Sequence, residues 1–267
     1  MKILGRAFSL AGRAMLAPVV LKGQSFFQML FHVRSKVVRD DSGWKGISMR
    51  LVTLLLFGFV ALGGESDWKV LFDGKTTSGW RGYHEKAFPA FGWVVQDGWI
   101  KHQSREELNN RRPGDIMTVD EFGDFELELE YRIGRACNSG IKYLVTEGNV
   151  KAIGFEYQVL DDPNWGAKLK RTQATGALYD LVPAGQTTLN PPGEINKVRI
   201  VVRGDRIEHW LNGAKVIEID RSSEAFRSAV AVSKFKEIAG FGQTRRGHIL
   251  LQDHGGEAWF RNIRIRE

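Results

Sequence analysis

The sequence has little of what defines several common protein classes. It contains one cysteine, Cys137, and seven prolines among its 267 residues. A single cysteine cannot form an internal disulfide, so a disulfide scaffold is excluded, and we expect Cys137 to be a packed small residue rather than a nucleophile. The composition also excludes a disordered or collagen-like chain. The length suits one large domain or two small ones.

Most of the chain also lacks an excess of charge of either sign. The formal net charge is +7, from 38 basic and 31 acidic residues. Nine of the basic residues and two of the acidic ones lie in residues 1–64, so residues 65–267 have 29 of each. Binding to a phosphate backbone requires several Lys or Arg side chains together. The neutral body therefore argues against nucleic acid as a partner.

The apolar run at residues 51–62 is shorter than a membrane-spanning helix. It has 12 residues and no charge, and it follows Met49-Arg50, whereas a transmembrane helix needs about 20 residues. Ala61 and Gly63 place small residues where a signal peptidase cleaves. We therefore predict a signal peptide, no stable membrane span after processing, and export to the periplasm or the extracellular space. A membrane anchor or a buried helix is the alternative.

Residues 1–48 fit a signal peptide poorly, because they place its apolar core almost fifty residues from the start. We expect the true start to be Met49, with residues 1–48 either an upstream translation artefact or a long amino-terminal region. Residues 1–64 are then an extension that contains the signal peptide. Residues 65–267 are expected to form one domain, without an internal repeat.

From residue 67 onward, apolar residues alternate with polar ones as they do in β-strands. The clearest case is residues 125–133, where every odd residue is apolar and every even one is charged. Strands are also expected at residues 70–72, 93–96, 99–102, 115–118, 140–145, 155–160, 197–203, 206–211, 215–219, 248–252 and 258–266.

Turn signals connect these strands. Gly204-Asp205 and Asn212-Gly213 predict two hairpins that join three consecutive strands into a meander. Only residues 222–235 are expected to hold a short helix. About a dozen short strands predict an all-β fold, a jelly-roll-like sandwich of two antiparallel sheets.

Eight segments in sequence order resemble a known family. They are LFDGK (71–75) with Gly79-Trp80, GDFEL (123–127) leading to Glu130, NSGI (138–141), EYQ (156–158), TGALY (175–179), WLNG (210–213), LQDHG (251–255) and FRNI (260–263). Residues 67–267 thereby resemble the 3-keto-disaccharide hydrolase family, formerly a domain of unknown function. The resemblance implies a concanavalin A-like lectin/glucanase sandwich, an exported protein and hydrolysis of glycosides that have a ketone at carbon 3. It also implies a carbohydrate substrate and a functional link to a sugar 3-dehydrogenase.

A ketone at carbon 3 acidifies the hydrogen on carbon 2, so the aglycone can leave carbon 1 by elimination before water adds. Such a site needs a base, an acid and a group that stabilises the enolate. Direct displacement would use two carboxylates, about 5–5.5 Å apart for retention and about 6.5–9.5 Å apart for inversion. The sequence leaves both routes open.

Glu156 is the first candidate for the catalytic base or acid. Alternation directs Glu156 and Gln158 away from the core. Asn138 and Lys142 are expected on the same outer face, where either would polarise the ketone oxygen, and Asn138 and Gln158 would bind sugar hydroxyls. The alternative is that Glu156 and Lys142 form only a cross-strand ion pair.

His254 and Asp161 are the second and third catalytic candidates. His254 follows a predicted strand and precedes two glycines, and its titration near neutrality suits proton transfer; alternatively it holds a turn. Asp161 follows the strand of Glu156. Asp161 and Asp162 are also candidates for binding a cation, although adjacent aspartates before a proline more often form turns. We expect no cofactor and no resident metal.

Three further residues are candidates for binding the sugar. If residues 125–133 lie in the same sheet as Glu156, Glu130 shares its face; the other glutamates of that strand indicate a solvated face. Trp210 and Trp165 are candidates for stacking on a sugar ring, and Trp165 lies in a basic loop that alternatively packs against the sandwich.

A non-catalytic, lectin-like carbohydrate-binding module or a structural surface domain are the alternatives to an enzyme.

Overall fold

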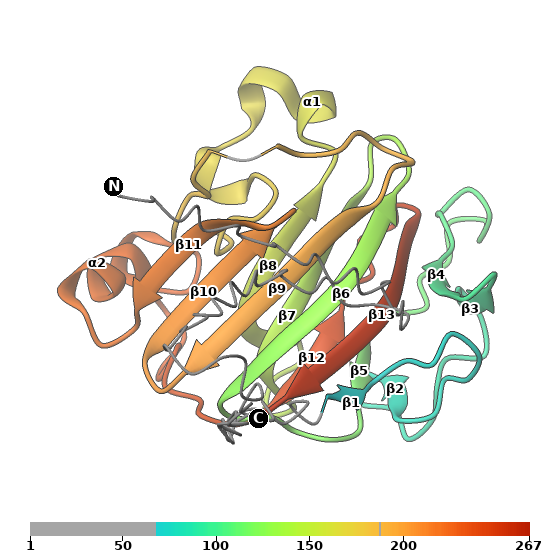
Figure 1. The fold of residues 1–267 in the computed structure, drawn as a ribbon, viewed down its shortest axis with the longest axis horizontal. Helices are drawn as coiled ribbons and strands as arrows, with labels where there is room; N and C mark the ends of the chain where they lie inside the picture. The colour runs from blue at the N-terminus through green and yellow to red at the C-terminus, as the bar shows by residue number, and fades with distance from the viewer. Residues whose placement is uncertain (1–67, 187) are drawn as a thin grey trace, which may run out of the picture. The chain divides into compact units, whose positions relative to one another are not determined.

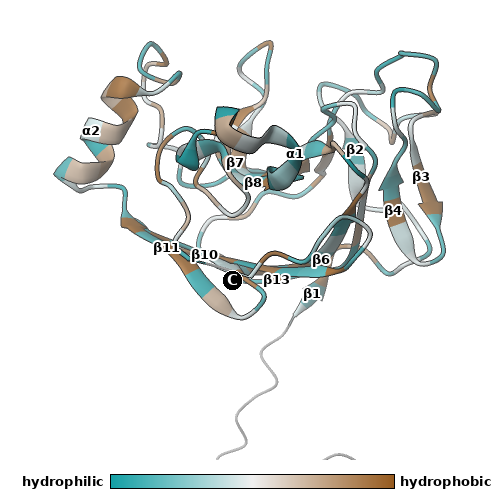
Figure 2. Ribbon diagram, turned by 90° about the horizontal axis from the view of Figure 1, so that it is seen from above, coloured by the Kyte–Doolittle hydropathy of each residue, from teal (hydrophilic) through white to brown (hydrophobic). Residues whose placement is uncertain are grey.

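The alternating pattern becomes two stacked antiparallel sheets in a computed structural model that describes residues 68–186 and 188–267. The predicted signal peptide and the rest of residues 1–64 lie outside the described residues. Figure 2 shows β7 and β8 in a layer above β6, β10, β11 and β13. The expected all-β, jelly-roll-like sandwich is confirmed.

The larger sheet has eight strands in the order β11-β10-β9-β6-β13-β4-β3, with β1 paired to β13. Its strands are β1 (Lys69–Val70), β3 (Trp93–Gln96), β4 (Trp99–His102), β6 (Phe125–Ile133), β9 (Asn196–Arg203), β10 (Arg206–Leu211), β11 (Ala214–Asp220) and β13 (Ala258–Arg266). The predicted meander is confirmed as β9, β10 and β11, which pair in sequence.

The smaller sheet has five strands in the order β2-β5-β12-β7-β8. They are β2 (Trp80–Gly82), β5 (Ile116–Thr118), β12 (His248–Leu251), β7 (Asn138–Thr146) and β8 (Ile153–Leu160). The sequence did not predict β2, because three residues are too few to show an alternation. Strand β6 belongs to the larger sheet, so the condition under which Glu130 and Glu156 would share a face is not met.

Two short helices lie beside the sheets (Figure 1). Helix α2 (Glu224–Val232) falls inside the segment predicted to be helical, and the Ser223 hydroxyl caps it by accepting from the Phe226 amide at 3.1 Å. Helix α1 (Asp162–Trp165) and the 3-10 turns η1 (Gly166–Lys168) and η2 (Arg171–Gln173) occupy the segment expected to be a loop. Within residues 68–186 and 188–267, no helix is long and apolar enough to span a membrane.

A polar contact crosses the core between the sheets. His209 on β10 and Tyr143 on β7 are both fully buried, and His209 Nε2 lies 2.8 Å from the Tyr143 hydroxyl. His209 Nδ1 lies 3.0 Å from the Gly176 carbonyl oxygen, so Nδ1 donates there and Nε2 accepts from Tyr143. Cys137 is buried, and burial raises the pKa of its thiol to about 12. This placement agrees with a packed residue rather than a nucleophile.

Candidate active site

Strands β7 and β8 bring the principal predicted residues onto the outer face of the smaller sheet. The register pairs Lys142 with Glu156 and Gly140 with Gln158, and Asn138 lies one row further along β7. The residues that alternate with them point between the sheets and are fully buried: Ile141, Tyr143, Tyr157 and Val159. Asn138, Lys142, Glu156 and Gln158 therefore share one face, as the sequence predicts.

Glu156 is buried without a charged partner. Its residue is 5% exposed, and it forms no ion pair with any described residue within 4.0 Å. With its amide nitrogen turned toward acceptors, Gln158 donates to Glu156 Oε1 at 3.1 Å. Burial raises the pKa of Glu156, and this effect outweighs the opposing charges of Lys142 and Lys234. Buried carboxyl groups are rarely left unpaired, so this arrangement marks a functional-site candidate.

The lysine beside Glu156 is not its ion-pair partner. The ammonium group of Lys142 donates to the Ala152 carbonyl oxygen at 3.4 Å. Lys142 and Glu156 are cross-strand neighbours, but they form no ion pair within 4.0 Å in the described chain. The interpretation of the two residues as a simple cross-strand ion pair therefore does not describe this structure.

Sequence reasoning missed a second lysine near Glu156. Lys234 follows α2, and its ammonium nitrogen lies 4.0 Å from the ring centre of Tyr179. The Tyr179 amide donates to the Glu156 carbonyl oxygen at 3.0 Å, which fixes Tyr179 beside β8. No local pattern in the sequence signals Lys234, because only the tertiary fold brings residues 179 and 234 together.

A glycine leaves the space that the Glu156 carboxyl group occupies. A Cβ atom at Gly140 would lie 2.6 Å from Glu156 Oε1. Next to Gly140, the Gln252 amide donates to the Gly140 carbonyl oxygen at 3.0 Å, and the Gln252 side-chain oxygen is buried without a hydrogen-bond partner in the described chain. Buried side-chain oxygens are rarely left without a donor, so this acceptor is a further unusual feature of the site.

Asp115 is a second carboxyl group that the sequence analysis did not select. Burial raises its pKa, and the charge of Lys142 opposes this shift. Its Oδ1 accepts from the Asp253 amide at 2.8 Å, which ties β5 to the loop that follows β12. The charge of Asp115 also contributes to raising the pKa of Glu156.

His254 lies in the same loop but makes no hydrogen bond or ion pair with the described residues. It is exposed. The neighbouring Asp253 holds the turn instead, because it accepts from the amides of Gly114 and Gly255 at 3.1 and 3.0 Å and lies 3.0 Å from His102 Nε2. Burial alone would raise the pKa of Asp253, but these bonds and the charge of His102 lower it. His254 is thus accessible to a ligand.

The carboxyl groups of Asp161 and Asp162 each accept hydrogen bonds from neighbouring segments of the chain. Asp161 is buried and accepts from the Ala136 amide at 2.7 Å. Asp162 accepts from the Thr175 amide at 3.0 Å and from its hydroxyl at 2.9 Å. These contacts fit the turn-forming interpretation. Across residues 68–186 and 188–267, no three His, Cys, Asp or Glu side chains gather as metal ligands.

Glu130 and Trp210 lie on the outer face of the larger sheet, away from Glu156. The Arg261 guanidinium donates to Glu130 at 2.8 Å, and Trp210 Nε1 donates to Glu208 at 2.8 Å. The condition under which Glu130 would share the face of Glu156 is not met, because β6 pairs with β9 and β13 rather than with β7. Trp165 in α1 is 42% exposed, and its contact with a sugar remains a prediction.

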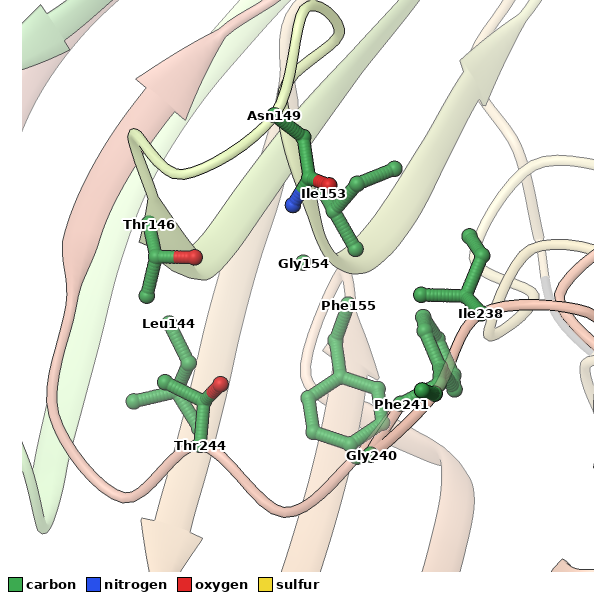
Figure 3. Close-up of a pocket in the computed structure, with 12 residues that line it drawn as sticks. Leu144, Thr146, Asn149, Ile153, Gly154, Phe155, Ile238, Gly240, Phe241 and Thr244 are labelled. Atoms are coloured by element: carbon green, nitrogen blue, oxygen red, sulfur yellow. The ribbon is translucent and has the colours of Figure 1, made fainter.

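Two hollows in the described part of the chain are not lined by Glu156. One of about 90 Å³ is lined by Leu144, Phe155 and Phe241, among others (Figure 3), and it is small beside the ~300–1,000 Å³ of ligand pockets. Another of about 350 Å³ is lined by Arg132 and Trp259 on the larger sheet. The chemistry therefore points to the outer face of the smaller sheet, where the unpaired polar groups gather.

Comparisons with known proteins identify the family. The profile of the 3-keto-alpha-glucoside-1,2-lyase-like domain matches residues 67–266. A 3-keto-disaccharide hydrolase of Bacteroides thetaiotaomicron is 34% identical over 223 residues, which are 73% of this chain and 77% of that protein.

Solved structures agree. A proposed glycosyl hydrolase from Parabacteroides distasonis superposes with a TM-score of 0.66 and 30% identity, over 74% of this chain and 93% of that one. A second from the same organism has a TM-score of 0.57 and 30% identity, over 75% and 98%. The chain therefore belongs to the family of 3-keto-alpha-glucoside-1,2-lyase-like domains, and it is an enzyme of the glycoside hydrolase class.

Proposed function

We propose that the protein cleaves 3-keto-glucosides, including 3-keto-disaccharides, by elimination followed by hydration. The observation that carries this proposal is the buried Glu156 carboxyl group, which has no ion-pair partner among the described residues and lies near two lysines. The name of the Bacteroides relative and the lyase-like description of the family support this substrate class. The lyase-like description of the family favours elimination over direct displacement.

In the proposed reaction, Glu156 removes the proton from carbon 2, and the electron pair of that bond forms an enolate with the oxygen on carbon 3. The enolate then collapses, a double bond forms between carbons 1 and 2, and the bond from carbon 1 to the aglycone oxygen breaks. The departing oxygen takes up a proton, for which His254 is the candidate donor. Water then adds across the double bond, so the net reaction is hydrolysis.

The other polar groups of the face bind and polarise the sugar in this proposal. Asn138 and Gln158 meet hydroxyl groups, and Lys142 lies beside the base. The raised pKa of Glu156 makes its carboxylate a stronger base near neutral pH than an exposed glutamate. The reaction as written uses protein groups and water alone.

A lectin-like carbohydrate-binding module is the second candidate. The 42% exposed Trp165 favours it, since an exposed aromatic ring can stack on a sugar. A binding module has no need for a buried, unpaired carboxyl group. Catalysis is therefore the better explanation of Glu156.

We also propose that the protein is exported and acts after a sugar 3-dehydrogenase. The 3-keto substrate requires prior oxidation of the alcohol on carbon 3, which is the chemistry of that enzyme class. Residues 51–62 supply the basis for export.

The test is aglycone release by the full-length protein from a chromogenic 3-keto-glucoside and from the unoxidised glucoside. We expect release from the keto sugar alone and a loss of at least about 100-fold in Glu156→Gln, the range of an essential proton-transfer group. Glu128→Gln is the matched control, because Glu128 pairs with Arg264 on the other sheet. Sugar binding without release from either compound would favour the lectin-like function instead.

A further inference from the structure

Lys234 reaches the site from a segment that is distant in sequence. Its backbone amide donates to Asp180 Oδ2 at 2.7 Å, which anchors the chain after α2 to the segment beside β8. Its ammonium nitrogen lies over the Tyr179 ring at 4.0 Å and near the Phe235 ring at 4.9 Å from the ring centre. Cation–π contacts of this kind help to hold an ammonium group in place.

The charge of Lys234 acts on the catalytic group of the proposed reaction. Lys234 is an exposed residue, but its ammonium group is partly desolvated, which lowers its pKa; the charge of Glu156 raises this pKa and that of Lys142 lowers it again. The three side chains therefore lie within electrostatic range of one another. Asp115 and Asp180 also lie within this range, so the argument for Lys234 depends on where its ammonium group lies and not on a local excess of positive charge.

The two lysines differ in what their ammonium groups contact. Lys142 donates to the Ala152 carbonyl oxygen. Lys234 makes no side-chain hydrogen bond and no ion pair with the described residues; its ammonium group contacts only aromatic rings. An ammonium group with no hydrogen-bond acceptor among the described residues is the better placed of the two to bond a substrate oxygen.

We propose that Lys234 is a catalytic residue whose ammonium group bonds the oxygen on carbon 3 and stabilises the enolate that forms when Glu156 takes the proton from carbon 2. This inference rests on the proposed function and assigns the enolate stabiliser to Lys234 rather than to Lys142 or Asn138. The carbonyl oxygen is neutral in the substrate and negative in the enolate, so the bond strengthens as the reaction proceeds.

The experiment measures kcat and KM for a 3-keto-glucoside in the full-length protein and in Lys234→Met, Lys234→Arg and Lys236→Met. Lys236 is the control, because it lies in the same segment and its side chain is 58% exposed. We expect Lys234→Met to lower kcat by about 100-fold with little change in KM, as for the loss of one oxyanion donor. Lys234→Arg should recover part of the loss, and Lys236→Met should match the wild type.

A second readout separates a catalytic role from a structural one. Removal of the Lys234 charge should raise the pKa of the Glu156 carboxyl group. Carbon-13 NMR of the wild type and of Lys234→Met measures this pKa. An unchanged kcat in Lys234→Met, or an unchanged Glu156 titration, would overturn the role of Lys234 while the wild-type activity still stands. A wild-type protein that releases no aglycone would refute the proposed function itself, and the enolate role with it.

Discussion

Glu156 serves the proposed chemistry at the expense of the stability of the fold. A carboxylate that is 5% exposed has lost most of its hydration, and no ion pair in the described chain compensates for that loss. The nearby lysines act at a distance, and burial remains the dominant influence on the Glu156 pKa, which it raises. A group that destabilises the fold is retained where function requires it.

Glu156→Gln should therefore stabilise the folded protein at neutral pH by about 1–3 kcal/mol, the cost of a buried and poorly satisfied polar group. The sign follows from the pKa. Because the folded-state pKa of Glu156 is raised above its ordinary value of 4.5, the wild type loses stability relative to the variant as the pH rises from 4.5 through the folded-state pKa. Urea unfolding of the wild type and of Glu156→Gln at pH 4 and pH 7 measures the difference in stability between them. An equal difference at the two pH values would contradict the prediction.

Single side chains of the site were predictable only where they share a strand pair. Alternation alone placed Glu156, Gln158 and Lys142 on one face, because a strand directs every second side chain to the same side. It could not place Lys234 or Asp115, since their positions depend on how distant segments pack. His254 was selected for its loop position, and the structure leaves it exposed beside Asp253.

Strands β7 and β8 act as a unit because their register sets the shape of the face. Gly140 lies opposite Gln158 and two residues before Lys142 in β7, and Glu156 fills the space that a side chain at Gly140 would take. A methyl group at Gly140 would lie 2.6 Å from Oε1, 3.0 Å from Cγ and 3.1 Å from Cδ of Glu156. All three atoms belong to one side chain, so that side chain must move while the backbone stays.

Gly140→Ala should lower kcat by about 10- to 100-fold, because a displacement near 1 Å of a catalytic group costs that much. The melting temperature should fall by only a few degrees, since the clash involves one side chain. Gly148→Ala is the control, because no atom lies within 4 Å of the added Cβ there. Full activity of Gly140→Ala would show that the position of Glu156 does not limit the reaction.

At the level of strands, alternation predicted where strands occur but not which sheet each one joins. Residues 125–133 became β6 with the expected faces, yet β6 lies in the other sheet from β7. A period of two fixes the two faces of a strand and leaves its partners undetermined. The better signal was charge, because the glutamates of β6 pair with the arginines of β13: Glu126 with Arg266, Glu128 with Arg264 and Glu130 with Arg261.

Across the whole domain, the two sheets are joined by an apolar core with a polar link. His209 on the larger sheet accepts from the Tyr143 hydroxyl on the smaller one. Tyr143 lies on β7, the strand that carries Lys142, two residues from Ile141, which pairs with Tyr157. Burial rather than this bond keeps His209 neutral, because a protonated Nε2 could instead donate to the Tyr143 hydroxyl oxygen. Protonation of His209 therefore bears on the stability of the whole domain.

The pH dependence of folding should report the neutral state of His209. Burial lowers the pKa of His209 from 6.5 to about 4, so between these values the unfolded chain binds a proton that the folded one does not. The contribution of His209 to the free energy of unfolding is complete above pH 6.5. It is lost as the pH falls toward 4, at up to about 1.4 kcal/mol per pH unit. Urea unfolding of the wild type and His209→Gln across this range isolates the effect, because every other titrating group is common to both. Parallel curves would mean that His209 is not held neutral, whereas curves that converge toward pH 4 would show that the folded protein keeps His209 neutral.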